Sequence, residues 1–275
     1  MSNEWARQPS QPAALPDDHF TKPSPARMWN YLQGGKDNYS LDRAVGEAIA
    51  AVYPDMFEQA AQCRRFLARA VLVLARDHGV RQFLDIGCGL PAPEHLSNVH
   101  DVAQDVHPDA RTVYVDNDKV VLAHARALLT PKTDAGVCAY LDADIRDIES
   151  ILVAAAETLD FARPVAFSML GVLATLPLDE AISIVATAMN SVPTGSFVVF
   201  DDGVAGGALS KGELKAREIG MYDYNVRTPE QMTRYFSGLE LVEPGLVPVH
   251  QWRPDLAEVG TLRPVEAYGA VGRKP

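Results

Sequence analysis

Short apolar runs alternate with amphipathic stretches from about residue 80 onward. The apolar runs are rich in β-branched and aromatic residues, and they predict strands at Gln82–Ile86, Thr112–Val115, Val137–Leu141, Val165–Met169 and Ser196–Phe200. Helical spacing predicts helices between and after them, over Lys119–Leu129, Ile145–Ala156, Leu178–Met189 and Thr228–Phe236. This alternation is typical of an α/β fold with a doubly wound, Rossmann-like sheet that is mostly parallel.

The end of the chain has a different pattern. Leu246–Gln251 and Glu266–Val271 are predicted as two strands that have only a loop between them. Parallel strands need a long crossover connection, whereas antiparallel strands do not. We therefore expect an antiparallel C-terminal pair at the edge of the sheet.

The region before residue 80 is predicted to be helical. Residues 1–20 are polar and punctuated by proline, and are expected to form a flexible leader. Ser24 and Pro25 are a favourable helix start, and Gly34 follows its expected end near Leu32. Further helices are expected from about Ser40 and from Asp55, where Glu58 would complete a capping box. The predicted organisation is a leader (1–20), a helical N-terminal cap (21–79) and an α/β core (80–275).

Composition and charge exclude several classes of protein. The net charge of -11 argues against general binding of nucleic acid, which depends on basic patches. The three cysteines are few and far apart, which predicts neither a disulfide framework nor a zinc site, and no metal site is expected. Neither a signal peptide nor an apolar run long enough for a membrane is found, so a cytoplasmic protein without membrane contact is expected.

A glycine turn follows the first predicted core strand. Gly87 and Gly89 lie at its carboxyl end, where open α/β sheets bind ligands. The loose spacing up to Ala92 also fits a dinucleotide site. Asp85 favours a different ligand, because a carboxylate there would repel a pyrophosphate but suits the ammonium of a methionyl group. Two prolines, at 91 and 93, also disfavour an immediate helix start after the turn.

Acidic residues also end the next two predicted strands. Asp116, followed by Asn117, can accept hydrogen bonds from both ribose hydroxyls of a nucleoside. Asp144 can accept from an adenine amino group, with Ile145 against the ring, although Asp144 can equally serve as a helix N-cap. Three carboxylates at three successive strand ends thus match the amino group, ribose and base of one ligand.

These segments resemble a known group of enzymes. Residues 83–89 (FLDIGCG) and 114–118 (YVDND) resemble the first two motifs of class I S-adenosylmethionine-dependent methyltransferases, and residues 267–274 (AYGAVGRK) resemble their last strand. Residues 26–39 (ARMWNYLQGGKDNY), 85–91 and 98–104 are similar to an actinobacterial family of proposed methyltransferases, formerly a domain of unknown function. The resemblance implies a class I fold with a helical cap, S-adenosylmethionine as cofactor and S-adenosylhomocysteine as product.

The N-terminal motif supplies further candidates for cofactor binding. Arg27 and Tyr31 share one helix face, and Gly34, Lys36 and Asn38 follow closely. We expect this segment to close over the cofactor, with Arg27 or Lys36 near the methionyl carboxylate. A plain helix terminus with a glycine cap is the alternative.

Methyl transfer requires no fixed catalytic signature, because aligning acceptor and methyl carbon is the main task. Ser168 and Met169 are expected beside the cofactor. The candidates for acting on the acceptor are Asp201, Asp202, Tyr222, Tyr224, His250 and Trp252. We expect a methyltransferase with a small-molecule acceptor. A non-catalytic sensor of S-adenosylmethionine and a nicotinamide-dependent oxidoreductase are the alternatives, and whether the chain forms a homodimer stays open.

Overall fold

The computed structural model describes residues 21–221, 224–255, 260 and 262–275. The expected leader and Tyr222 lie outside these residues. In the described part, one eight-stranded sheet has the order β3-β2-β1-β4-β5-β8-β6, and β7 pairs with β8. The strands are β1 (Gln82–Ile86), β2 (Arg111–Asp116), β3 (Val137–Asp142), β4 (Ala166–Leu170), β5 (Phe197–Gly203), β6 (Glu240–Leu241), β7 (Val247–Pro248) and β8 (Ala267–Arg273).

The predicted α/β sheet is confirmed. β1 to β5 are parallel, and β8 runs antiparallel to β5, as the pattern of the tail indicates. The strand expected at Leu246–Gln251 is much shorter, because β7 ends at Pro248 and a 3-10 turn, η4 (Val249–Gln251), follows. Proline has no N–H to donate to a ladder, so it ends the pairing there.

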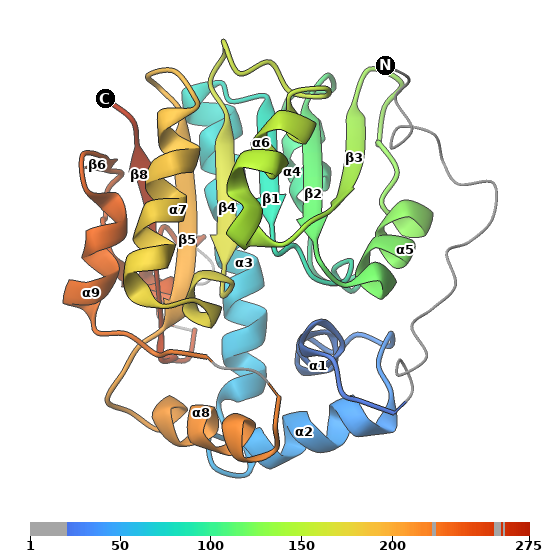
Figure 1. Cartoon of the computed structure of the whole chain (residues 1–275), viewed down its shortest axis with the longest axis vertical. Coiled ribbons are helices and arrows are strands. Elements are labelled where there is room, and N and C mark those ends of the chain that lie inside the picture. The colour runs from blue at the N-terminus through green and yellow to red at the C-terminus, as the bar shows by residue number, and fades with distance from the viewer. Residues whose placement is uncertain (1–20, 222–223, 256–259, 261) are drawn as a thin grey trace.

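Helices cover both faces of the sheet (Figure 1). One face packs against α3 (Met56–His78), α4 (Val99–Val106) and α5 (Lys119–Leu128). The other packs against α6 (Ile148–Ala155), α7 (Leu178–Asn190) and the pair α9 (Pro229–Thr233) and η3 (Arg234–Phe236). Two short 3-10 turns, η1 (Ile145–Asp147) and η2 (Leu173–Thr175), follow β3 and β4.

The cap lies at the edge where the parallel strands end, below the sheet in Figure 1. It consists of α1 (Pro25–Leu32), α2 (Ser40–Ala50), the start of α3 and α8 (Leu209–Glu218), which share one apolar cluster. The later part of α3 packs on the sheet instead. This helix therefore contacts both cap and core, although all of it lies within the range expected for the cap, 21–79.

Two expected helix caps are wrong in detail. The side chain of Asp55 does not cap α3, and Glu58 accepts a hydrogen bond from Gln62 at 2.7 Å rather than completing a capping box. Ser24 precedes α1 as expected, but its hydroxyl donates to Asp118 at 3.0 Å and does not cap the helix. Because Asp118 begins α5, this hydrogen bond ties the cap to the core.

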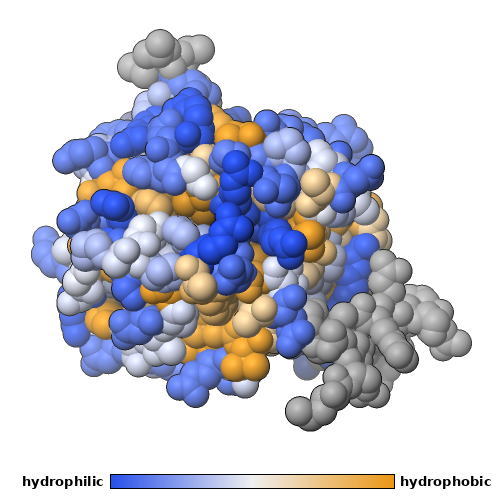
Figure 2. Space-filling model, turned by 90° about the horizontal axis from the view of Figure 1, so that it is seen from above, coloured by the Kyte–Doolittle hydropathy of each residue, from blue (hydrophilic) through white to orange (hydrophobic). Residues whose placement is uncertain are grey.

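The surface gives no sign of a membrane segment within the described residues. Each helix there is too short or too polar to cross a bilayer. On the face seen in Figure 2, hydrophilic and hydrophobic residues are interspersed.

Candidate functional site

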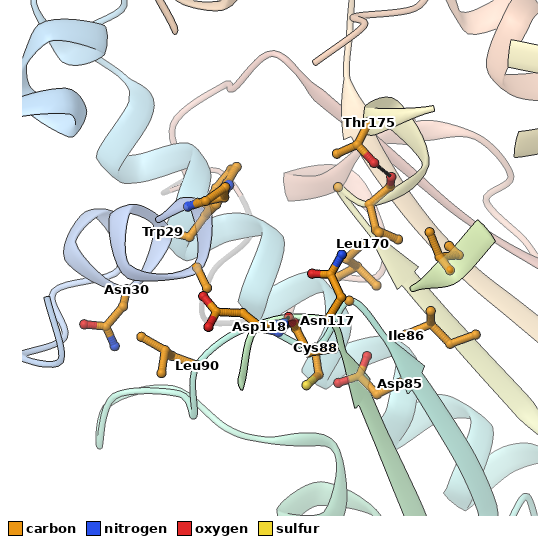
Figure 3. Close-up of a pocket in the computed structure, with 18 of the residues that line it drawn as sticks. Trp29, Asn30, Asp85, Ile86, Cys88, Leu90, Asn117, Asp118, Leu170 and Thr175 are labelled. Atoms are coloured by element: carbon orange, nitrogen blue, oxygen red, sulfur yellow. Dashed lines mark hydrogen bonds between the residues drawn. The ribbon is translucent and has the colours of Figure 1, made fainter. Parts of the chain in front are cut away.

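A cavity of about 520 Å³ lies between the cap and the carboxyl ends of β1 to β5. Sites for small molecules typically measure roughly 300 to 1,000 Å³. The lining comes from α1, α3, the carboxyl-end parts of β1, β2, β4 and β5, and the loops after β1 to β4. It includes Trp29, Asn30, Cys63, Arg64, Asp85, Gly87, Gly89, Asp116, Asn117, Asp118, Asp144, Ile145, Leu170, Thr175 and Asp201. Figure 3 shows Trp29 on the side of α1 and Thr175 on the side of η2, where its hydroxyl donates to the carbonyl of Val172 at 2.7 Å.

The glycine turn forms the floor of this cavity. Gly87 and Gly89 have φ angles of 72° and 64°, a conformation that side chains disfavour. A Cβ at Gly87 would also lie 2.8 Å from that of Val172. The Gly87 N–H donates to the carbonyl of Val115 at 2.9 Å, which fixes the turn against β2. Glycine is therefore required here both for backbone conformation and for space.

Asp116 ends β2 beside this turn. Its carboxylate accepts from the Gly89 N–H at 3.0 Å and from the Asp118 N–H at 2.9 Å. Burial raises the pKa of Asp116 to about 6, although these backbone donors oppose the shift. Two oxygens held in place by backbone N–H groups form a rigid acceptor for a diol.

Asp85 and Arg64 present polar atoms that have no hydrogen-bond partner among the described residues. Asp85 Oδ1 accepts from the Ser168 hydroxyl, but Oδ2 is buried and unpartnered. Arg64 Nη2 donates to Asn98 at 3.1 Å, while its Nε is unpartnered. Burial raises the pKa of Asp85, and Arg64 acts against the shift. Buried polar groups are normally satisfied, so a ligand with one cationic and one anionic group would complete this pair.

Asp144 and Asn117 meet at the far end of the cavity, after β3 and β2. Asn117 Nδ2 donates to Asp144 at 3.2 Å, and Asp144 also caps η1 by accepting from the Arg146 N–H at 2.9 Å. Ile145 is buried beside them. The carboxylate thus forms the expected N-cap, and it also lines the cavity.

The five N-terminal candidates, Arg27, Tyr31, Gly34, Lys36 and Asn38, all lie outside the cavity lining. Arg27 is buried and forms an ion pair with Asp42 at 2.7 Å, so it holds α1 against α2. The Tyr31 hydroxyl donates to Glu47 at 3.2 Å, and Lys36 is exposed. The expectation that Arg27 or Lys36 lies near the ligand therefore finds no support in this arrangement.

The double glycine of this motif, Gly34 and Gly35, instead lies close to Asn30 and fixes the position of its side chain. Asn30 does line the cavity. Asn30 Oδ1 accepts from the Asp37 N–H and from Asn38 Nδ2, both at 3.0 Å. Gly35 packs so closely that an added Cβ would lie 2.3 Å from Asn30 Nδ2. Gly34 has a positive φ of 80°, which ends the turn after α1. The motif thus positions the α1 residues that face the cavity.

The remaining candidates are the residues on β4, β5 and the later loops. The Ser168 hydroxyl donates to Asp85 and Met169 is buried in the core, so neither lines the cavity. Successive strand residues point to opposite faces, so Asp201 lines the cavity while Asp202 faces Arg227, with 3.8 Å between Oδ2 and Nη1. The Tyr224 hydroxyl donates to Asp202 at 3.4 Å, and His250 and Trp252 also lie outside the lining.

Sequence reasoning missed Arg64, Cys63 and Trp29. For Arg64 a signal exists, because it lies three residues before Leu67 and extends the predicted apolar stripe of α3. An arginine on the buried face of a helix needs a partner in the interior. Trp29 is half-buried on α1 and could not be assigned to the cavity without the packing of the cap.

Comparisons with known proteins show the family to which the chain belongs. The family model described as S-adenosyl methyltransferase matches residues 15–275. A DUF574 family protein from Streptomyces avermitilis is 37% identical, with a TM-score of 0.87 over 93% of this chain and 99% of that one. A proposed methyltransferase from Thermobifida fusca is also 37% identical, with a TM-score of 0.82 over 94% and 97%. No curated protein matches the sequence. The chain therefore belongs to the S-adenosyl methyltransferase family and is an S-adenosylmethionine-dependent methyltransferase.

Proposed function

We propose that the cavity binds S-adenosylmethionine along the ends of β3, β2 and β1. The adenine lies beside Asp144 and Ile145, the ribose hydroxyls donate to Asp116, and the methionyl group reaches Asp85 and Arg64. The observation that carries this placement is the unpartnered pair Asp85 Oδ2 and Arg64 Nε. The cofactor has an ammonium for the first atom and a carboxylate for the second.

The same geometry disfavours a nicotinamide dinucleotide. A pyrophosphate needs backbone N–H groups at a helix N-terminus close to the glycine turn. Here α4 begins only at Val99, and a capping box between Asn98 and Asp101 already occupies its start. Asp85 and Asp116 would add repulsion of the phosphates.

We further propose that the methyl acceptor is a small molecule. The cap covers the strand ends, so α1 and α3 enclose the ligand from the side opposite the glycine turn. The bound cofactor supplies an electrophilic methyl group, and the protein aligns the acceptor with it. The net charge of -11 disfavours nucleic acid as acceptor.

Transfer of a labelled methyl group tests the class of acceptor. The protein is incubated with methyl-labelled S-adenosylmethionine and a cell extract that is separated into small molecules, protein and nucleic acid. We expect label in the small-molecule fraction, and none there with a heat-inactivated control. Label confined to protein or nucleic acid would contradict the proposal.

Gly35→Ala tests the role of the N-terminal motif. The added Cβ displaces Asn30, since it would lie 2.3 Å from Nδ2. Crowding of this kind costs roughly 1 to 3 kcal/mol. We expect S-adenosylhomocysteine to bind about tenfold more weakly, which is about 1.4 kcal/mol, when measured by calorimetry.

Lys36→Ala is the matched control in the same segment, because Lys36 is exposed and outside the cavity lining. The affinity of this variant for S-adenosylhomocysteine is expected to stay within twofold of that of the unmodified protein. A loss in Lys36→Ala as large as that in Gly35→Ala would instead favour direct contact between Lys36 and the cofactor.

A further inference from the structure

Asp201 lines the cavity from a strand end, and the proposed cofactor position leaves its carboxylate unused. It lies on β5, and β4 separates this strand from β1, where the methionyl group is placed. Asp201 is 3% exposed, and its Oδ2 has no hydrogen-bond partner among the described residues. Buried polar atoms are normally satisfied, so a ligand in the cavity that Asp201 lines can supply the missing donor.

The surroundings of Asp201 favour one kind of ligand. The same cavity is also lined by Cys63, Leu170 and Thr175. The cations among the described lining residues are Arg64 and Arg146. Arg146 lies at the adenine end, 3.3 Å from Asp144, and Arg64 acts on Asp85. An anionic acceptor would thus meet a carboxylate at β5 without a cation to balance it.

We propose that this end of the cavity takes a neutral or cationic acceptor with a nucleophilic O–H or N–H group, and that Asp201 accepts its proton. This inference rests on the proposed position of the cofactor. In the step, the proton moves from the acceptor's oxygen or nitrogen to Asp201 Oδ2. The freed electron pair forms the bond to the methyl carbon as the carbon–sulfur bond breaks, and that bond's electron pair stays on sulfur.

The ionisation of Asp201 fits this role. Burial raises the pKa of Asp201 to about 7. Its other titratable and charged neighbours are Asp202 on the same strand, and Asp85 and Arg64 across the cavity. A base is most effective when its pKa lies near the working pH. Below about pH 7 the carboxyl holds a proton and cannot accept another.

Matched pairs of probes test the inference by binding, without a known acceptor. The pairs are tyramine with 4-hydroxyphenylacetate, histamine with imidazole-4-acetate, and tryptamine with indole-3-acetate, each titrated into the complex with S-adenosylhomocysteine. We expect at least one amine to bind tenfold or more tightly than its acetate partner at about pH 8. The same amine should bind less tightly at about pH 6 than at about pH 8, because Asp201 is protonated at the lower pH. Tighter binding of the acetates, or binding of none of the six probes, would overturn the inference.

Variants of the two neighbouring carboxylates identify the residue responsible. Asp201→Asn keeps the size of the side chain, and is expected to remove both the preference for the amine and its pH dependence. Its affinity for S-adenosylhomocysteine should stay within twofold. Asp202→Asn, which alters the opposite face of β5, should keep the preference. A preference that survives in Asp201→Asn would assign it to another group and overturn the role of Asp201.

Titration with S-adenosylhomocysteine alone comes first and separates the two proposals. If this ligand does not bind, the proposed cofactor site fails. If it binds and the amines show no preference, only the inference about the acceptor fails.

Discussion

Arg64→Met should weaken binding of S-adenosylhomocysteine by about 30-fold, while 5′-methylthioadenosine binds within twofold of the unmodified protein. The first ligand has the amino-acid group that Arg64 is proposed to hold, and the second lacks it. Arg64 is buried with its Nε unpartnered, so its bond to a carboxylate is charge-assisted and shielded from water. Such hydrogen bonds contribute roughly 1.5 to 3 kcal/mol. Calorimetry on both ligands measures the difference.

Arg65→Met is the matched control for this prediction. Arg65 is the next residue on α3, but its side chain is 38% exposed and lies 3.9 Å from Glu58. Its removal should leave both affinities unchanged. An equal loss of both ligands in Arg64→Met would show that Arg64 supports the cavity through Asn98 rather than by holding the ligand. Unchanged binding of S-adenosylhomocysteine would contradict the proposed site.

Arg227→Met should destabilise the fold by roughly 3 kcal/mol or more, the range found when one partner of a buried ion pair is removed. Arg227 is buried against Asp202, donates to the carbonyl of Leu176 and lies over the ring of Tyr235. The change would leave the Asp202 carboxylate buried without its cation. The free energy of unfolding is measured by urea denaturation at two pH values.

The loss should grow with pH in the range above the ordinary pKa of a carboxyl group. Burial raises the pKa of Asp202 well above its ordinary value, and Arg227 lowers it. Without Arg227 the folded pKa rises further, so the folded protein binds a proton that the unfolded chain has released. Stability then falls as pH rises through this range.

Arg234→Met removes an exposed arginine from its pair with Asp179, and should cost less than about 1 kcal/mol. A similarly small effect of Arg227→Met at about pH 8 would show that the buried pair contributes little to stability.

The positions of the carboxylates at the ends of β1, β2 and β3 are predictable, because each can be located from the residues next to it in sequence. Asp85, Asp116 and Asp144 lie within three residues of the end of an apolar run, and parallel strands bring such positions to one edge. The antiparallel C-terminal strand was predictable for a similar reason, since the tail has no helical stretch between its apolar runs.

The cap was less predictable because its contacts join residues far apart in sequence. Arg27 looks like a ligand residue until Asp42 is placed beside it. The sequence pattern does not predict α8, since Gly212 in its middle weakens the helical tendency of this segment. The packing of α8 against α2, with Gly212 close to Ile49, explains that glycine. Asp201 and Asp202 were both candidates, and only the register of β5 separates them.

A crystal structure of the complex with S-adenosylhomocysteine tests the central claim most directly. We predict density along the ends of β3, β2 and β1, with both ribose hydroxyls on Asp116 and the amino-acid group between Asp85 and Arg64. The sulfur should face the ends of β4 and β5, where Asp201 lies. A ligand bound in the reverse direction, or elsewhere on the protein with Asp85 and Arg64 unpartnered, would contradict this account.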